Sequence, residues 1–151
     1  MRHASFETPA GFDLDQKRLA SGDVSLFFVA GRRESLLLRQ VYPAQVALER
    51  RPMERWIAHF PFKEHRRFRH EGFENWGVTE PRPMEGMCRR GWRRLPSPLG
   101  RCAERVAVSV AVVDKNLDRL LLAEHASACD QGDAVVTRAV ARMNWHRNIG
   151  D

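Results

Sequence analysis

The chain has 151 residues, of which 25 are Lys or Arg and 19 are Asp or Glu, so its formal net charge is +6. This length is typical of one domain, and we expect residues 1–151 to form a single one. The apolar fraction of 43% is sufficient for a buried core. No apolar run approaches the roughly 18 residues that cross a bilayer, and the first residues lack the apolar stretch of a secretory signal. We therefore expect a cytoplasmic protein without a membrane partner.

The first 42 residues predict a loose lead-in followed by a pair of strands. Pro9 and Gly11 interrupt residues 1–20, where we expect no regular element. The run at 24–29 is short, β-branched and aromatic, which predicts a buried strand. Residues 35–42 predict a second strand that forms a hairpin with the first, although their three consecutive leucines are also compatible with a helix.

Short helices are expected after this strand pair. Residues 44–50 favour a helix, and Pro52 is compatible with the first turn of another helix at about 53–60. In that second helix, apolar side chains recur at positions i, i+3, i+4 and i+7 and predict one buried face. These side chains are Met53, Trp56, Ile57 and Phe60. Because packing explains this face, we do not interpret its tryptophan as a base-stacking residue.

Residues 61–100 predict a long, loop-rich basic segment. Five prolines and five glycines are distributed along it, a composition typical of loops with a short strand or two at most. A loop of this length is uncommon inside a compact domain and is often functional.

The last third of the chain, residues 101–148, is predicted to be mainly helical. Its apolar residues recur every three or four positions, as in a packed helix, yet four valines from Val106 to Val112 also alternate, as in a half-buried strand. We favour one long helix because no Gly or Pro interrupts residues 101–130, while a strand followed by a helix remains open for residues 101–121.

A final helix is expected to begin near Asp133. One face of this helix is apolar and consists of Val136, Val140 and Met143. Together, these elements predict a small α+β domain with an N-terminal strand pair, a long basic loop region and a mainly helical C-terminal third.

The excess of positive charge is concentrated in residues 50–94. This segment has 12 basic and 6 acidic residues, whereas the rest of the chain is balanced. Arginine outnumbers lysine 22 to 3, which suits bidentate phosphate recognition but also results from a GC-rich genome. Two clusters, at 63–70 and 89–94, combine several arginines with an aromatic residue.

These clusters predict a nucleic-acid-binding surface. Guanidinium groups bind phosphate oxygens, and aromatic rings stack on unpaired bases. The sequence has no helix-turn-helix or zinc-finger pattern, which favours RNA or a single strand over a duplex. We expect an accessory component of a larger nucleoprotein assembly, with other protein subunits as partners. The predicted binding residues are Arg66, Arg67, Phe68, Arg69, Arg89, Arg90, Trp92, Arg93 and Arg94.

Two other functions remain open. Arginine and tryptophan are favoured anchors of protein interfaces, so the same surface would suit a protein–protein interaction module such as an assembly subunit or an inhibitor. A small metal-independent ribonuclease would need a positioned histidine beside an arginine, and His65, His70 and His146 are the candidates. The spacing of His59, His65 and His70 matches no metal site, and the three cysteines form no paired pattern. We therefore favour a non-enzymatic protein without metal or cofactor.

Overall fold

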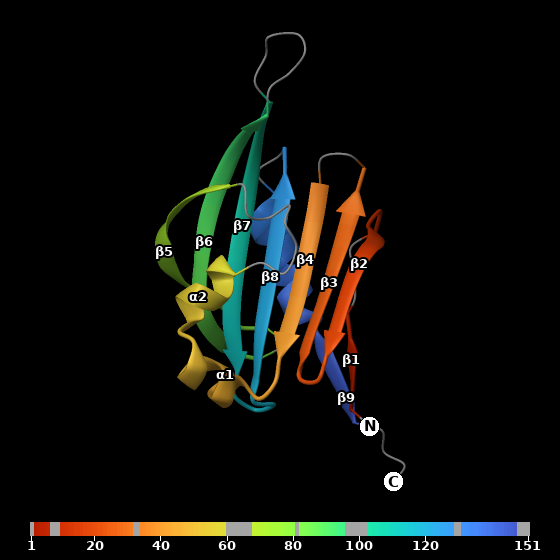
Figure 1. Cartoon of the computed structure of the whole chain (residues 1–151), viewed down its shortest axis with the longest axis vertical. Helices are drawn as coiled ribbons and strands as arrows, with labels where there is room; N and C mark the ends of the chain where they lie inside the picture. Colours follow the sequence, from red (N-terminus) through yellow and green to blue (C-terminus); the bar gives the residue numbers. More distant parts are fainter. Residues whose placement is uncertain are drawn as a thin grey trace.

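The computed structural model describes residues 2–6, 10–31, 34–59, 68–80, 82–95, 103–128 and 131–147. Strands dominate these residues, and three short helices accompany them (Figure 1). The strands are β1 (Arg2–Ser5), β2 (Asp13–Ala20), β3 (Asp23–Ala30), β4 (Glu34–Val41), β5 (Arg69–Val78), β6 (Met84–Leu95), β7 (Ala103–Asp114), β8 (Arg119–Ser127) and β9 (Asn144–Arg147). The helices are α1 (Ala44–Arg50), α2 (Met53–Ala58) and α3 (Gly132–Ala141).

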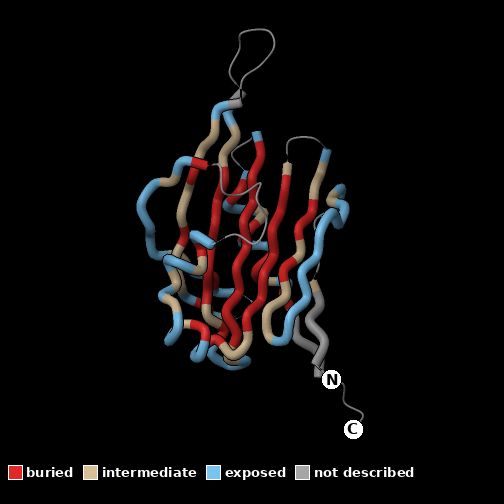
Figure 2. The backbone as a smooth tube through the Cα atoms, viewed as in Figure 1, coloured by how far each residue is buried: buried red, intermediate tan, exposed pale blue. Residues whose placement is uncertain are grey.

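Seven strands form one antiparallel sheet in the order β2-β3-β4-β8-β7-β6-β5. Most neighbours in this order are also consecutive in sequence, and the pairing of β4 with β8 joins the two halves of the sheet. The central strands are buried, whereas the edge strands β2 and β5 are largely exposed (Figure 2). Strands β1 and β9 form a separate antiparallel pair.

Helices cover both sides of the sheet (Figure 1). Helix α3 packs on one side, which we call the α3 face, where its Val140 joins a core that includes Val110. Helices α1 and α2 pack on the opposite side, the α2 face, where Ile57 joins a core that includes Ala111. None of the helices in the described part of the chain has the length and apolar character needed to cross a membrane.

The predicted fold class is wrong in its last third. Instead of a mainly helical segment, residues 101–148 contribute β7, β8 and β9 and only one helix, α3. The alternating valines of β7 fill the α3 face, and their heptad-like spacing is a coincidence of composition. The turn between β7 and β8 has no glycine because Asp118 takes the positive φ of 48° itself. Aspartate adopts this region more readily than most residues, so the strand ends without the usual signal.

Two other expectations are also corrected. Residues 1–20 contain β1 and β2 rather than an unstructured lead-in, and residues 61–100 contain the long strands β5 and β6. Glycines in β6 mark close contacts instead of loops. A Cβ atom on Gly86 would lie 1.8 Å from the carbonyl oxygen of Ala111, and one on Gly91 would lie 2.6 Å from Nδ1 of His70.

The remaining local predictions are confirmed except for the end of the helix expected at 53–60, since α2 ends at Ala58 and Phe60 lies outside the described residues. The strand at 24–29 lies within β3, the strand at 35–42 corresponds to β4, and the two form the expected hairpin. Helices α1, α2 and α3 begin at or within one residue of their predicted starts. The predicted apolar face of the last helix is buried, with Val136, Val140 and Met143 each at most 1% exposed.

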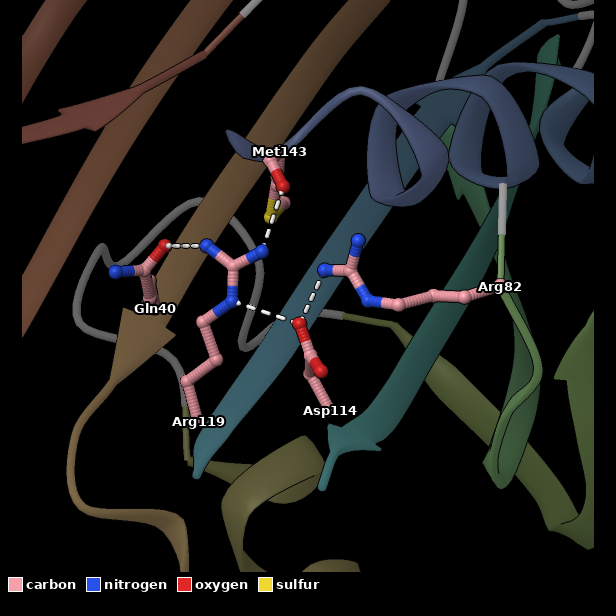
Figure 3. Close-up of polar contacts among 5 residues, drawn as sticks. All are labelled: Gln40, Arg82, Asp114, Arg119 and Met143. Carbon is pink, nitrogen blue, oxygen red and sulfur yellow. Dashed lines mark hydrogen bonds and ion pairs between the residues drawn. The ribbon is translucent and has the colours of Figure 1, made fainter. Parts of the chain in front are cut away.

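A buried polar cluster connects the end of α3 to the sheet (Figure 3). Arg119, 1% exposed, donates from Nε to Asp114 at 3.0 Å, from Nη1 to Gln40 at 3.2 Å and from Nη2 to the carbonyl oxygen of Met143 at 2.9 Å. Arg82 donates to the same Asp114 carboxylate. Burial alone would raise the pKa of Asp114, but the hydrogen bonds from Arg82 and Arg119 lower it below its ordinary value. The Asp114 carboxylate therefore joins two arginines in a structural ion network, in which the Nε atom of Arg82 is buried without a hydrogen-bond partner.

The edge strand β2 is exposed along its whole length. Its register with β3 shifts between Leu14 and Gln16, which marks a β-bulge, and charged side chains lie on both sides of the bulge. These charged residues are Asp13, Asp15, Lys17 and Arg18.

Candidate nucleic-acid interface

Strand geometry divides the arginines of β6 between the two faces of the sheet, since successive side chains point to opposite sides. Arg90 lies on the α3 face and donates to Asp133 of α3 at 2.8 Å. Arg89 lies on the α2 face, with its guanidinium carbon 5.3 Å from the ring centroid of Phe73. The cluster at 89–94 is therefore not one continuous clamp, and Arg90 is already paired with a carboxylate.

The surroundings of Arg89 form a polar group on the α2 face that the sequence did not reveal. Glu124, 2% exposed, accepts a hydrogen bond from Ser109 at 2.5 Å. Burial lowers the pKa of Arg89, while the charge of Glu124 acts in the opposite direction. Burial and the charge of Arg89 also lower the pKa of His70. Reading β7 as a helix concealed this group, because only strand pairing places Ser109 beside Glu124.

The cavity beside this polar group is too small for an organic ligand. It has about 20 Å³ of free volume, and Arg39, Trp56 and Glu124 are among the residues that line it. That volume is comparable to the space needed by about one water molecule. The polar group therefore has no room for a substrate in this conformation.

The cluster at 63–70 is described only from Phe68 onwards, and Arg66 and Arg67 lie outside the described residues. Phe68 is 8% exposed and packs against Ala107 and Ala126. Its ring is buried in the core, which leaves it unavailable for stacking on a base. Arg69 is exposed at the start of β5.

Four of the predicted residues gather at one end of the sheet, where β5 begins and β6 ends. Arg69, Trp92, Arg93 and Arg94 line a single open hollow. Arg69 lies directly opposite Trp92 in the β5–β6 pairing, which explains how residues so far apart in sequence meet. Trp92 and Arg93 are half-buried, and Arg94 is exposed.

The arginines of this hollow have no acidic partner among the residues that the structure describes. Within the described ranges, no ion pair joins Arg69, Arg93 or Arg94 to a carboxylate. Glu104 is the cross-strand neighbour of Arg94, yet the two form no ion pair. The hollow lies at the rim of the sheet, because alternation along β6 puts Trp92 and Arg94 on the α3 face and Arg93 on the α2 face.

One further arginine, absent from the predicted set, lies beside this hollow. Arg105 of β7 is directly opposite Arg93 of β6. Burial and the charge of Arg93 lower the pKa of Arg105. The valine-rich run that follows Arg105 gave no sign of a basic site, and only the strand register connects this residue to β6.

Neither metal ligation nor thiol chemistry has a site in the described parts of the chain. No group of three or more His, Cys, Asp and Glu side chains there could hold a metal ion. Cys88 is a free, buried cysteine, and burial raises the pKa of its thiol. The hollow remains the arrangement with the clearest binding chemistry.

Comparison with known proteins assigns the chain to no family. No family model matches it, and neither the curated proteins nor the solved structures include a significant match.

Proposed function

We propose that the protein binds single-stranded nucleic acid, RNA in particular, at the hollow lined by Arg69, Trp92, Arg93 and Arg94. One observation carries this proposal: three arginines that form no ion pair with a described carboxylate line a single open hollow together with Trp92. Arginine forks match phosphate oxygens, and an indole face supports stacking of any base. The combination suits a backbone contact on each side of a stacked nucleotide.

The tryptophan in the hollow favours a single strand over a duplex. Stacking on an indole face requires a base that is not paired within a duplex, and Trp92 is among the residues that line the hollow. The hollow lies where β5 begins and β6 ends, and Trp92 there is half-buried. A role as an accessory component of a nucleoprotein assembly follows from such sequence-tolerant binding.

A ribonuclease receives less support from the same geometry. His70 packs closely against Gly91 and is not among the residues that line the hollow. A protein partner with an acidic surface is an outcome that the binding test distinguishes, because acidic peptides lack bases that stack.

The test is equilibrium binding of a fluorescently labelled 12-nucleotide RNA between about 50 and 200 mM NaCl. Each phosphate contact of a single strand contributes about −0.7 to the slope of log affinity against log salt. Three contacts predict a slope of about −2 and hence a fall of about 20-fold across this range. Arg94→Gln should reduce the slope by about 0.7, whereas Arg18→Gln on the far edge strand should not change it.

Two results would contradict the proposal. One is a salt-independent affinity for RNA, and the other is an Arg94→Gln variant that binds RNA as the unmodified protein does. Duplex DNA of equal length is the matched ligand, and we expect it to bind more weakly because its bases are not free to stack.

A further inference from the structure

Arg93 and Arg105 occupy directly opposite positions on neighbouring antiparallel strands. Residues paired in this way have Cβ atoms about 5 Å apart, and like charges at such positions repel one another. Both side chains are half-buried, so water screens this repulsion less than it would on an open surface. Without a ligand, this pair of cations contributes no stability to the sheet.

The surroundings of Arg105 leave part of its hydrogen-bonding capacity unused. Its Nε atom is buried and has no hydrogen-bond partner. Neither Arg93 nor Arg105 has an ion pair with any carboxylate in the ranges that the structure describes. Buried donors are nearly always satisfied in folded proteins, so an unsatisfied one invites an explanation such as an absent ion.

The described side chains near this pair offer no counter-charge. Alternation along β6 and β7 places Arg89 and Ser109 on the same α2 face as the pair, whereas Glu104 and Arg94 point to the other side. The acid that acts on Arg89 is Glu124, whose described contact is with Ser109. No described carboxylate balances Arg93 and Arg105, and an anionic ligand would supply the missing charge.

We propose that Arg93 and Arg105 together seat one phosphate group, held between their two guanidinium forks. A phosphate has enough acceptor oxygens to receive hydrogen bonds from both side chains, and its charge cancels their repulsion. Where the phosphate belongs to a nucleic-acid backbone, this inference rests on the proposed function and adds Arg105 to its binding residues. The same seat accepts free inorganic phosphate, which provides an independent probe.

A double-mutant cycle on RNA binding tests whether one phosphate is shared. Arg93→Gln and Arg105→Gln should each lower the affinity for the 12-nucleotide RNA about 10-fold and reduce the salt slope by about 0.7. The double variant should lose little more than either single variant, since both side chains serve the same phosphate. Losses that simply add would overturn the shared seat.

Inorganic phosphate separates this inference from the proposed function. Adding phosphate at constant ionic strength should raise the thermal midpoint of the unmodified protein, and Arg105→Gln should abolish this rise while Arg18→Gln preserves it. A phosphate response that depends on Arg105, in a protein that does not bind RNA, would support the seat and refute the function. RNA binding that is unchanged in Arg105→Gln would support the function and refute the seat.

Folding of the variants is checked in the same experiment. Without phosphate, Arg105→Gln should unfold at the same or a higher temperature, because the substitution removes repulsion between two cations. Arg105→Lys keeps the charge but loses the planar fork, so its phosphate response should be smaller than that of the unmodified protein. An equal response in Arg105→Lys would refute a seat that depends on guanidinium geometry.

Discussion

The two ends of strand β7 use arginine in different ways. At the end with Asp114, the guanidinium of Arg119 is buried and donates to a carboxylate, an amide and a backbone carbonyl. At the other end, about 30 Å away along the strand, Arg105 lies opposite Arg93, and neither forms an ion pair with a described carboxylate. A buried arginine with all its partners present contributes to stability, whereas an arginine beside another arginine leaves binding capacity unused. Partners, rather than residue type, separate a structural arginine from one that is available to a ligand.

The largest effect on stability is expected at the Asp114 end of β7. Arg119→Met should lower the free energy of unfolding by about 3–5 kcal/mol, because Asp114 would keep only one arginine partner in a buried setting. Urea unfolding followed by circular dichroism measures this loss. Arg18→Met, on the exposed edge strand, is the control and should change stability by less than about 0.5 kcal/mol. Equal effects of the two substitutions would remove the distinction between the two ends.

The stability at acidic pH should reveal the contribution of the same cluster around Asp114. The pKa of Asp114 is lowered in the folded protein, so its contribution to stability is complete above its ordinary value of 3.8 and is lost as the pH falls below that value. The unfolding free energy should therefore decrease between about pH 5 and pH 2, and part of this decrease should be absent in Asp114→Asn. If Asp114→Asn kept the full pH dependence of the unfolding free energy, other carboxylates would be responsible for the acid destabilisation.

Near the Arg105 end of β7, substitutions of Trp92 allow the contribution of base stacking to RNA binding to be separated from that of charge. Trp92→Ala should weaken RNA binding by about 1–3 kcal/mol, the usual contribution of one stacked base, without changing the salt slope. Trp92→Phe retains an aromatic face and should recover much of the affinity. A change in salt slope in either variant would mean that the arginines had moved, and the stacking role would not be supported.

The smallest effect is expected at Arg90, which is already paired. Its ion pair with Asp133 is partly exposed, so Arg90→Gln should cost less than about 1 kcal/mol in stability and leave RNA affinity nearly unchanged. Arg94 lies further along β6 on the same α3 face, and Arg94→Gln should reduce the salt slope of RNA binding instead. Similar slopes for the two variants would show that carboxylate pairing does not decide which arginines bind.

Local sequence signals predicted β3 because they were unambiguous, whereas they missed β2 and left β4 open to a helix. The run at 24–29 is bounded by glycines and is too short for a helix, so only a strand fits it. The valines from Val106 to Val112 satisfied both periods, and the long-range pairing of β7 with β6 and β8 decided between them. Such pairing is invisible to a reading of one segment at a time.

The sequence predicted which residues could form the candidate site, but not how the strands bring them together. Arginines and a tryptophan in one basic segment predicted Arg69, Trp92, Arg93 and Arg94 as binding residues, and the hollow brings these four together. Nothing local distinguished them from Phe68, which the core absorbs, or from Arg90, which Asp133 engages. Arg105 was missed because its relation to β6 exists only through the strand register.

The bulged edge strand β2 also limits how the molecules can associate. A regular outer strand offers free backbone groups to any passing chain, and natural proteins commonly block this with a bulge and with lysine. β2 has both, together with Asp13 and Arg18, although Leu14 and Leu19 are exposed on it. At high concentration the sheet should resist growing into fibrils from this side, and replacing Lys17 with valine should weaken that resistance.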